Sequence, residues 1–241
     1  MLVDTNSCQR FHAWPFNPRA TLMQKNDITY KESYIQSGGS EKLHLRCIIK
    51  KKAIGTFVIV HGVGEHLRRY QHLEQWLLAE GYNCYLYDHR GHGLSEGIRG
   101  DVKSFHEYAN DLGIVCQLAK SENPALPLYV FGHSMGSLVV LLSLILRPGK
   151  WKGAIVSGVP LKIVTPIPKW QEVLGNQVVK VMPTIYIPND IDPAYLSHDE
   201  AVIEAYKTDK LVQHKITLRW GLAFISAVKE VKARLGETSN T

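Results

Sequence analysis

Cysteine is scarce in this chain, and the few cysteines present do not form pairs. The 241 residues contain no C-x-x-C motif, and the four cysteines are widely spaced: Cys8, Cys47, Cys84 and Cys116. Such spacing argues against both a disulfide framework and a zinc site. We therefore expect buried free thiols in a reducing compartment, which favours a cytoplasmic protein.

Long hydrophobic runs are also lacking. The longest apolar run covers residues 138–146, which is too short to cross a bilayer. It predicts instead a helix buried under a sheet. Residues 1–18 do not show the charged start and apolar stretch that are typical of a signal peptide. We expect contact with membranes to be peripheral at most.

Charge of one sign is not concentrated in any part of the sequence. The formal net charge is +6, with 21% charged and 45% hydrophobic residues, which is ordinary for a soluble globular domain. No stripe interleaves aromatic with basic side chains, so we do not expect a nucleic-acid partner. The mild positive charge favours solubility or attraction to an anionic lipid surface. The length suffices for one sizeable domain with its own core.

Four short apolar runs without alternation predict parallel strands that are buried on both faces. They lie at residues 56–60, 82–87, 128–131 and 154–157. Helical segments separate them, one over residues 70–80 and another that opens at Ser104 with a capping box. Two further strands, residues 28–35 and 43–49, are expected to form an edge hairpin. This order predicts an α/β fold with a mostly parallel sheet and helices on both faces.

The pattern changes after Pro160, where prolines become frequent and no clean strand–helix unit follows. We interpret this stretch as a cap or lid, with a short helix opened by a capping box at Ser197. A final helix over residues 216–235 has apolar residues at helical spacing, which predict its buried face: Trp220, Phe224, Val228, Val231 and Leu235. The predicted parts are an arm (1–26), an α/β core (27–160), the cap (161–213) and a helix leading back toward the core (214–241).

The sequence Gly132-His133-Ser134-Met135-Gly136 has the form G-x-S-x-G. An apolar run precedes it and a long apolar segment follows, so its context is strand, sharp turn and helix. In a nucleophile elbow, strained backbone angles hold a serine and require small neighbours two positions away. We therefore expect Ser134 to be a catalytic nucleophile of acyl transfer, in a turn shaped by the two glycines.

A second glycine-rich loop follows the strand that ends at residue 60. It contains His61, Gly62, Val63 and Gly64. In this architecture one oxyanion donor is a backbone N–H group of that loop, and the other is the N–H of the residue after the nucleophile. The expected oxyanion donors are therefore Val63 and Met135.

A third glycine-rich loop, residues 88–95, follows the next strand along the chain. Its Asp88 and Arg90 are expected to shape the loop through hydrogen bonds rather than to take part in catalysis. All three loops follow the carboxyl ends of strands, where ligands bind in open α/β sheets.

With these three loops in this order, the chain resembles an α/β-hydrolase of the monoacylglycerol lipase and lysophospholipase group, also described as serine aminopeptidase-like. The resemblance continues into the cap at residues 191–193, 196–197 and 206–209. It implies hydrolysis of a single-acyl lipid ester by Ser134, with an amphipathic cap guiding the acyl chain. The expected partner is a small lipid ester, and no metal or organic cofactor is implied, because serine, a base and backbone donors suffice.

The chain departs from this group after the cap. In the group, the acid and the histidine of the triad follow two further strands, and neither those strands nor a late histidine occurs before residue 241. We therefore expect the C-terminal strands to be missing and the activity of this chain alone to be impaired. The acids and histidines that do follow Ser134 lie in or beside the cap: Asp190, Asp192, Asp199, Asp209, His198 and His214.

Histidines near the motifs are not expected to supply the base. His133 should point away from the serine, and His61 and His66 should shape their loop. Three alternatives stay open: another segment or chain completes the triad, the chain is a non-catalytic lipid-binding or interaction module, or the elbow serves an acyltransferase or a peptidase. Isoleucines in the cap favour lipid: Ile163, Ile167, Ile185 and Ile187. Acyl-chain length, head group and oligomeric state stay open.

Overall fold

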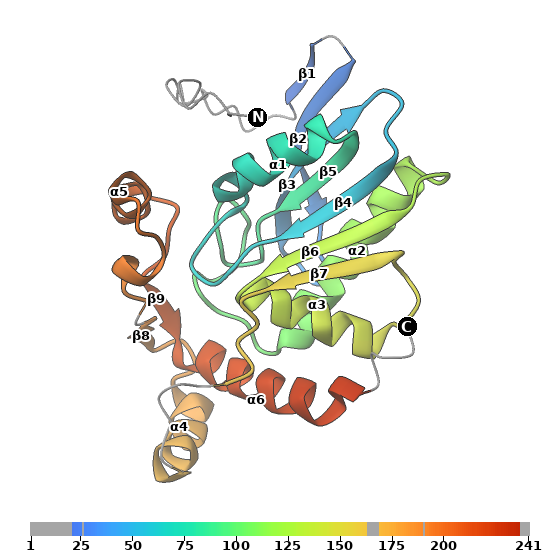
Figure 1. Cartoon of the computed structure of the whole chain (residues 1–241). Helices are drawn as coiled ribbons and strands as arrows, with labels where there is room; N and C mark the ends of the chain where they lie inside the picture. The colour runs from blue at the N-terminus through green and yellow to red at the C-terminus, as the bar shows by residue number, and fades with distance from the viewer. Residues whose placement is uncertain (1–20, 26, 163–168, 190, 237–241) are drawn as a thin grey trace.

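A seven-stranded sheet forms the centre of the computed structural model, which describes residues 21–25, 27–162, 169–189 and 191–236. The strand order is β1-β2-β3-β5-β4-β6-β7 (Figure 1). Four strands are parallel: β4 (Gly55–Val60), β5 (Tyr82–Tyr87), β6 (Leu128–His133) and β7 (Gly153–Ser157). Three are antiparallel at one edge: β1 (Thr21–Lys25), β2 (Ile28–Gln36) and β3 (Lys42–Lys50). The predicted parallel strands and edge hairpin are confirmed. Strand β1, which lies inside the segment predicted as an arm, was missed.

The two faces of the sheet carry separate hydrophobic clusters. All six residues of β4 are buried. Val58 and Val60 belong to the larger cluster, whereas Phe57 and Ile59 belong to the smaller one. Neighbouring residues of a strand point to opposite faces, so an apolar run without alternation supplies both clusters.

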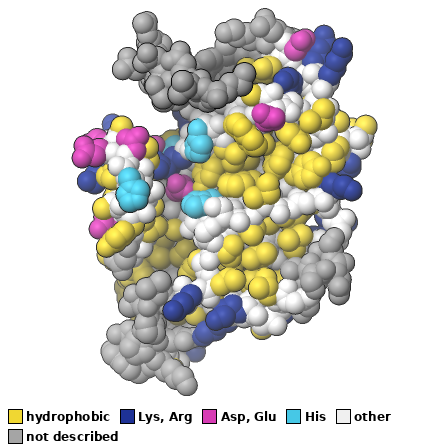
Figure 2. Space-filling view, in the orientation of Figure 1, with side chains coloured by type: hydrophobic (Ala, Val, Ile, Leu, Met, Phe, Trp, Pro, Cys, Tyr) yellow, Lys and Arg dark blue, Asp and Glu magenta, His cyan; other side chains and the backbone are white. Residues whose placement is uncertain are grey.

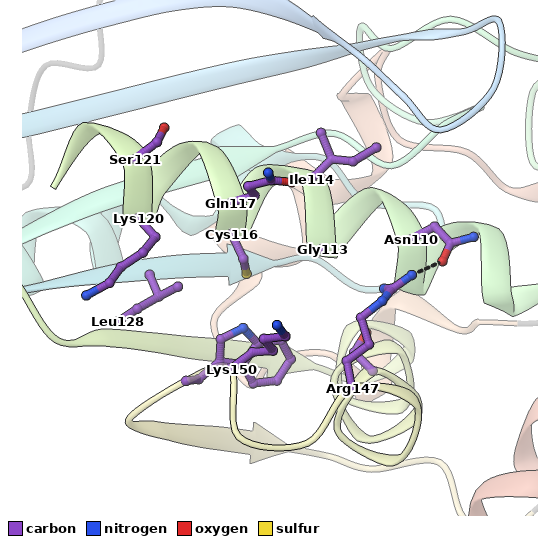
Figure 3. A pocket seen from close by; sticks show the side chains of 12 residues that line it. Asn110, Gly113, Ile114, Cys116, Gln117, Lys120, Ser121, Leu128, Arg147 and Lys150 are labelled. Atoms are coloured by element: carbon purple, nitrogen blue, oxygen red, sulfur yellow. Dashed lines mark hydrogen bonds between the residues drawn. The ribbon is translucent and has the colours of Figure 1, made fainter. Parts of the chain in front are cut away.

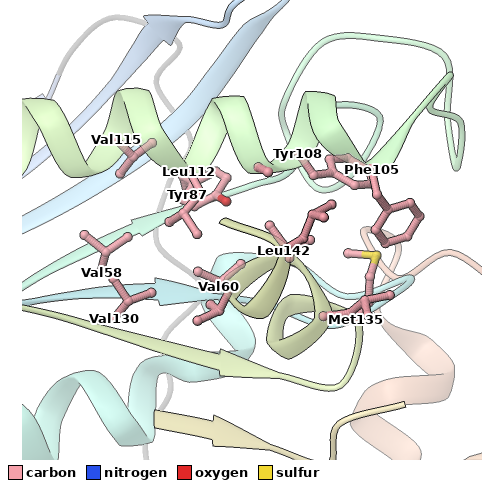
Figure 4. Close-up of a cluster of buried hydrophobic side chains, with 14 of the residues drawn as sticks. Val58, Val60, Tyr87, Phe105, Tyr108, Leu112, Val115, Val130, Met135 and Leu142 are labelled. Carbon is pink, nitrogen blue, oxygen red and sulfur yellow. The ribbon is translucent and has the colours of Figure 1, made fainter. Parts of the chain in front are cut away.

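Three helices cover the face with the larger cluster, namely α2 (Phe105–Glu122), α3 (Met135–Leu146) and α6 (Leu218–Arg234). Figure 4 shows side chains of α2 and α3 pointing at those of the strands. The smaller cluster lies under the 3-10 turn Leu67–Tyr70 and helix α1 (Gln71–Ala79). Helices on both faces of a mostly parallel sheet are the predicted architecture.

The ends of these helices follow local side-chain chemistry. Gly81, with φ 92°, ends the turn after α1, in the left-handed region that favours glycine. Ser104 caps α2 by accepting a hydrogen bond from the His106 N–H. Glu107 does not complete the predicted capping box, because its carboxylate accepts from the Arg90 guanidinium instead. Helix α6 starts at the cap residue Thr217 and ends at Arg234, so Leu235 is exposed rather than on the buried face.

The region predicted as a cap contains more regular structure than its sequence suggests. It holds α4 (Lys169–Val181), β8 (Tyr186–Pro188), the 3-10 turn Pro193–Tyr195 and α5 (Glu200–Thr208). Strand β8 pairs with β9 (Lys215–Thr217), directly before α6. The capping box predicted at Ser197 was misplaced, because Asp199 is the cap residue of α5 and accepts from the Ala201 N–H.

Three of the cysteines are buried free thiols, at Cys47, Cys84 and Cys116, while Cys8 lies outside the described residues. Burial raises the pKa of the Cys47 thiol to about 12, so it stays protonated at neutral pH. None of the helices in the described ranges combines the length and the apolar character that a bilayer crossing needs.

Candidate active site

Ser134 stands at a sharp turn between the end of β6 and the start of α3. Its backbone angles are φ 51° and ψ −120°, in the left-handed region that residues with a side chain rarely adopt. A Cβ on Gly132 would come within 2.6 Å of the Gly136 carbonyl oxygen. A Cβ on Gly136 would overlap the Val60 carbonyl oxygen and lie 2.7 Å from that of His61. The spacing of G-x-S-x-G is thus required by backbone packing.

The loop after β4 lies against this turn. A Cβ on Gly62 would stand 3.4 Å from the Ser134 Cβ, so the glycine allows the two backbones to approach. The Gly62 N–H donates to Glu65 Oε2 and to the Tyr70 hydroxyl, both at 3.2 Å. Tyr70 also donates to Glu65 Oε2 at 2.7 Å. These bonds fix the loop conformation beside the serine.

The two N–H groups expected to form an oxyanion hole have no hydrogen-bond acceptor among the described residues. Among the described residues, neither the Val63 N–H nor the Met135 N–H donates to another group. Met135 is the first residue of α3, where N–H groups have no partner within the helix and favour a negative charge. Two N–H donors without other partners are what a tetrahedral oxyanion needs.

Asp88 joins the loops that follow β4 and β5. Its carboxylate accepts from the Leu67 N–H at 2.7 Å, the Leu94 N–H at 2.8 Å and His44 Nδ1 at 3.0 Å. Burial alone would raise the pKa of Asp88, but the hydrogen bond and the charge of His44 outweigh it and lower the pKa below its ordinary value. Asp88 is therefore an ionised structural group, in agreement with its predicted role in shaping the loop.

Arg90 is held by acids from α2. Its guanidinium donates to both carboxylate oxygens of Asp111 at 2.8 Å and to Glu107. Burial works against the charge, but these acids raise the pKa of Arg90 further. This buried pair fixes the 88–95 loop onto α2, so Arg90 also has a structural position.

The histidines near the site have partners other than Ser134. His61 donates from Nδ1 to the Gly62 carbonyl at 2.7 Å and accepts the His89 N–H at Nε2, at 2.9 Å. Burial lowers its pKa, which agrees with this neutral tautomer. His133 points toward β7, where Nδ1 lies 3.3 Å from the Ser157 hydroxyl. Neither ring therefore serves as the general base of the serine.

Buried histidines continue behind His61. The rings of His61 and His89 are 4.4 Å apart between centroids, and His92 lies 5.5 Å from His61. Burial lowers the pKa of His92 to about 3, so this ring is neutral at physiological pH. These neutral rings fill the space below the loops rather than hold a proton for the reaction.

The acids and histidines of the cap do not assemble a triad. Asp192 and Asp199 accept from backbone N–H groups at the starts of their helical turns, and the ring of His214 packs at 5.5 Å from that of Tyr206. His198 is exposed, and Asp190 lies outside the described residues. Across the part of the chain that the structure describes, the Ser134 carbonyl accepts from the Ser137 hydroxyl but the Ser134 hydroxyl makes no hydrogen bond, and no three His, Cys, Asp or Glu side chains gather into a metal site.

The cap is bound to the loop after β4 by contacts that the sequence did not indicate. His66 Nε2 donates to Asp209 Oδ2 at 2.8 Å, and the Gln213 N–H donates to the Gly64 carbonyl at 2.8 Å. The Arg69 guanidinium lies over the Tyr206 ring, 4.9 Å from its centroid. His66 thus links the loop after β4 to the region predicted as a cap.

The strand–turn–helix at Ser134, the loop after β4 and the mostly parallel sheet together define an α/β-hydrolase. Residues 51–239 match the family model described as serine aminopeptidase, S33. The chain belongs to that family of serine hydrolases.

Several relatives of known name are monoacylglycerol lipases. The monoacylglycerol lipase of Mycolicibacterium smegmatis is 33% identical over 160 residues, which cover 66% of this chain and 57% of the relative. The human monoglyceride lipase is 31% identical over 180 residues, which cover 73% and 59%. The crystal structure of Paleococcus ferrophilus monoacylglycerol lipase superposes with a TM-score of 0.69 at 28% identity, over 78% of this chain and 71% of that one. The chain thus spans a little over half the length of these curated relatives.

Proposed function

We propose that this chain is the nucleophile-bearing part of a serine hydrolase that cleaves the carboxylic ester of a single-acyl lipid, such as a monoacylglycerol or a lysophospholipid. The observation that carries this proposal is the geometry of Ser134, which stands at φ 51° and ψ −120° between two obligatory glycines, beside free N–H groups. That geometry suits attack on an acyl carbonyl. The cytoplasm is the compartment we propose for it.

The proposed reaction uses Ser134 Oγ as the nucleophile and the N–H groups of Val63 and Met135 as oxyanion donors. The hydroxyl proton leaves to a general base as the oxygen attacks the ester carbon, and the alcohol departs with a proton. Water then hydrolyses the acyl-serine. Each oxyanion donor is worth about 3 kcal/mol of transition-state stabilisation in enzymes where one has been removed.

Impaired activity of this chain alone is part of the proposal. A serine hydroxyl is a weak nucleophile without an adjacent base. Among the described residues the Ser134 hydroxyl has no imidazole partner, and the nearest motif histidines, His61 and His133, are bonded elsewhere. We propose that another segment or chain supplies the acid and the base.

Lipid is favoured over peptide by the names of the relatives and by the cap. Several apolar side chains of the cap are exposed: Val173, Leu174, Val181, Met182 and Tyr186. Such a surface suits an acyl chain or the surface of a membrane. We propose that the residues 161–213 form the cap over a core of residues 27–160, with the segment 214–241 leading back toward that core and residues 1–26 as an arm.

A paired hydrolysis assay tests the substrate class. The purified chain is incubated with a monoacylglycerol and, separately, with an aminoacyl amide that has a free N-terminal amine. We expect slow release of fatty acid that disappears in the Ser134→Ala variant, and no release from the amide. Cleavage of the amide alone would contradict the lipid proposal.

A second candidate is a lipid-binding module without catalysis. It is favoured by one observation, the lack of an imidazole partner for Ser134 among the described residues, where the His61 and His133 rings are bonded elsewhere. In the same assay this module would bind the monoacylglycerol with equal affinity in wild type and Ser134→Ala but would release no fatty acid from it.

A further inference from the structure

A cavity of about 650 Å³ lies between α2 and the segment that follows α3. Leu128, the first residue of β6, lines it. Ser134 follows the last residue of the same strand, and a strand rises about 3.3 Å per residue, which puts the two residues about 20 Å apart. The cavity is therefore separate from the candidate active site.

The floor of the cavity is apolar. Cys116 and Leu128 are buried there, and Ile114 and Trp151 are half-buried. Burial raises the pKa of the Cys116 thiol, and a hydrogen bond from the Trp151 side chain offsets only part of this effect, so the sulfur is uncharged. The volume is within the range of about 300–1,000 Å³ that is common for small-molecule pockets.

The rim of the cavity is positively charged. Lys120, Arg147 and Lys150 line it, and no acidic residue occurs among the described residues that do so. Figure 3 shows Lys120 on α2 and Arg147 and Lys150 opposite it. A cavity with an apolar floor and a cationic rim is complementary to a molecule with an alkyl chain and one anionic head.

Arg147 is held in place at this rim. Its Nη1 donates to the Ala109 carbonyl at 3.2 Å, and its Nη2 donates to the Asn110 side chain (Figure 3). A Cβ on Gly113 would lie 2.9 Å from Nη1, so the glycine in the middle of α2 makes room for the guanidinium. A glycine inside a helix costs about 1 kcal/mol relative to alanine. The guanidinium has five N–H donors, and donors beyond these two bonds can reach an anion.

We propose that this cavity binds a single-chain fatty carboxylate, with the alkyl chain against Ile114, Leu128 and Trp151 and the carboxylate at the cationic rim. Arg147 provides a planar pair of donors, and Lys150, an exposed side chain of the same segment, adds a second positive charge. This site does not rest on the function of Ser134, because the chemistry of the rim and floor alone defines it.

Trp151 provides a direct reporter of binding. The chain is titrated with dodecanoate below its micellar concentration, and tryptophan fluorescence is compared with that of the Trp151→Phe variant, which isolates the signal of the cavity. We expect a saturable change in wild type that is lost in Trp151→Phe. The Lys150→Glu variant should bind about tenfold more weakly, which corresponds to about 1.4 kcal/mol. Dodecyltrimethylammonium, with the same chain and opposite charge, should give no saturable change.

Lys152→Glu is the matched control, because this exposed lysine carries the same charge two residues away and does not line the cavity. It should bind dodecanoate as wild type does, and circular dichroism should be the same in all variants. The proposal is overturned by the absence of a saturable Trp151 signal, by equal affinity in wild type and Lys150→Glu, or by an equal response to the cationic amphiphile. Binding in the Ser134→Ala variant should be unchanged, which separates this site from the proposed reaction.

Discussion

The loops beside Ser134 and the outer edge of β7 belong to the same sheet, but they differ in how fully their polar groups are hydrogen-bonded. At the loops, buried charges such as Asp88 and Arg90 have several hydrogen bonds each. At the other end of the strand order, β7 pairs with β6 on one side only among the described residues. There Ile155 is 53% exposed, and Figure 2 shows hydrophobic side chains gathered on this face of the molecule.

The difference separates what a nucleophile elbow needs from what a catalytic triad needs. The elbow depends on a short sequence and on the strands beside it. Ser134 and the loop after β4 lie within residues 60–136, and two bonds from outside support them: the Ser157 carbonyl accepts the Ser134 N–H, and the Gln213 N–H donates to the Gly64 carbonyl. A general base has to come from another element, and none of the described elements provides it. The exposed apolar edge of β7 is also a site at which other chains could pair and aggregate.

Replacing Gly136 should destabilise the turn at Ser134 strongly. In Gly136→Ala the new Cβ would overlap the Val60 carbonyl oxygen, so the backbone at the elbow has to move. We expect a loss of about 3 kcal/mol in the free energy of unfolding, measured by urea denaturation. Gly153→Ala is the control, because its Cβ would make an ordinary contact of 3.5 Å with the Tyr129 ring. Equal stability of both variants would show that the elbow is not tightly packed.

Removing the charge of Asp88 should lower the free energy of unfolding by less than the Gly136→Ala change does. Asp88→Asn weakens three hydrogen bonds to a buried carboxylate, and we expect a loss of about 2 kcal/mol at pH 7. Because the folded-state pKa of Asp88 is below its unfolded value, this stabilisation is present above the unfolded value, near pH 4, and is lost as the pH falls through the folded pKa. Wild type and variant should therefore converge in stability in acid. Parallel pH profiles would contradict the assignment.

The link between cap and loop should have a smaller effect. Asp209→Asn weakens the hydrogen bond with His66, and since Asp209 is partly exposed we expect a loss of about 1 kcal/mol or less in the free energy of unfolding. The readout is limited proteolysis of the cap, which should be faster in the variant. Asp192→Asn, which leaves an amide oxygen to cap its turn, should be cleaved as wild type is. Equal cleavage of both variants would mean that the His66 contact does not hold the cap.

The open edge should respond in association rather than in stability. In Ile155→Lys an exposed apolar side chain of β7 becomes charged, and the free energy of unfolding should change by less than about 0.5 kcal/mol. Light scattering against concentration should show weaker self-association, because a lysine on an edge strand opposes pairing. Ile54→Lys, at a site 59% exposed and outside β7, should associate as wild type does. An equal reduction of self-association in both variants would show that the edge strand β7 does not drive association.

The sequence predicted the core of the fold well, because each element there has its own local signal. Apolar runs without alternation mark β4 and β5, and the long apolar run marks α3, which is buried along most of its length. The spacing of G-x-S-x-G marks the turn, and the structure gives its reason in the clashes that Gly132 and Gly136 avoid.

The cap was predicted poorly, because its elements depend on contacts between distant residues. Strands β8 and β9 have three residues each and exist by pairing across the cap. The bond from His66 to Asp209 joins residues 143 positions apart, which no local pattern reveals. At α5, Ser197 and Asp199 are both good caps, and only the structure shows that Asp199 takes this position while Ser197 accepts from the Asp199 N–H. Helix α4 follows a proline-rich stretch in which the sequence showed no clean strand–helix unit.

We propose that Ser134 is positioned for acyl transfer and that the described residues give it no general base. Fluorophosphonate labelling of the purified chain, beside Ser134→Ala and with human monoglyceride lipase as the reference, tests it most directly. The account predicts a folded chain, by circular dichroism, in which Ser134 is labelled at least about a thousandfold more slowly than the serine of the reference. Labelling at the rate of the reference that disappears in Ser134→Ala would contradict it, because a base would then have to lie within the chain.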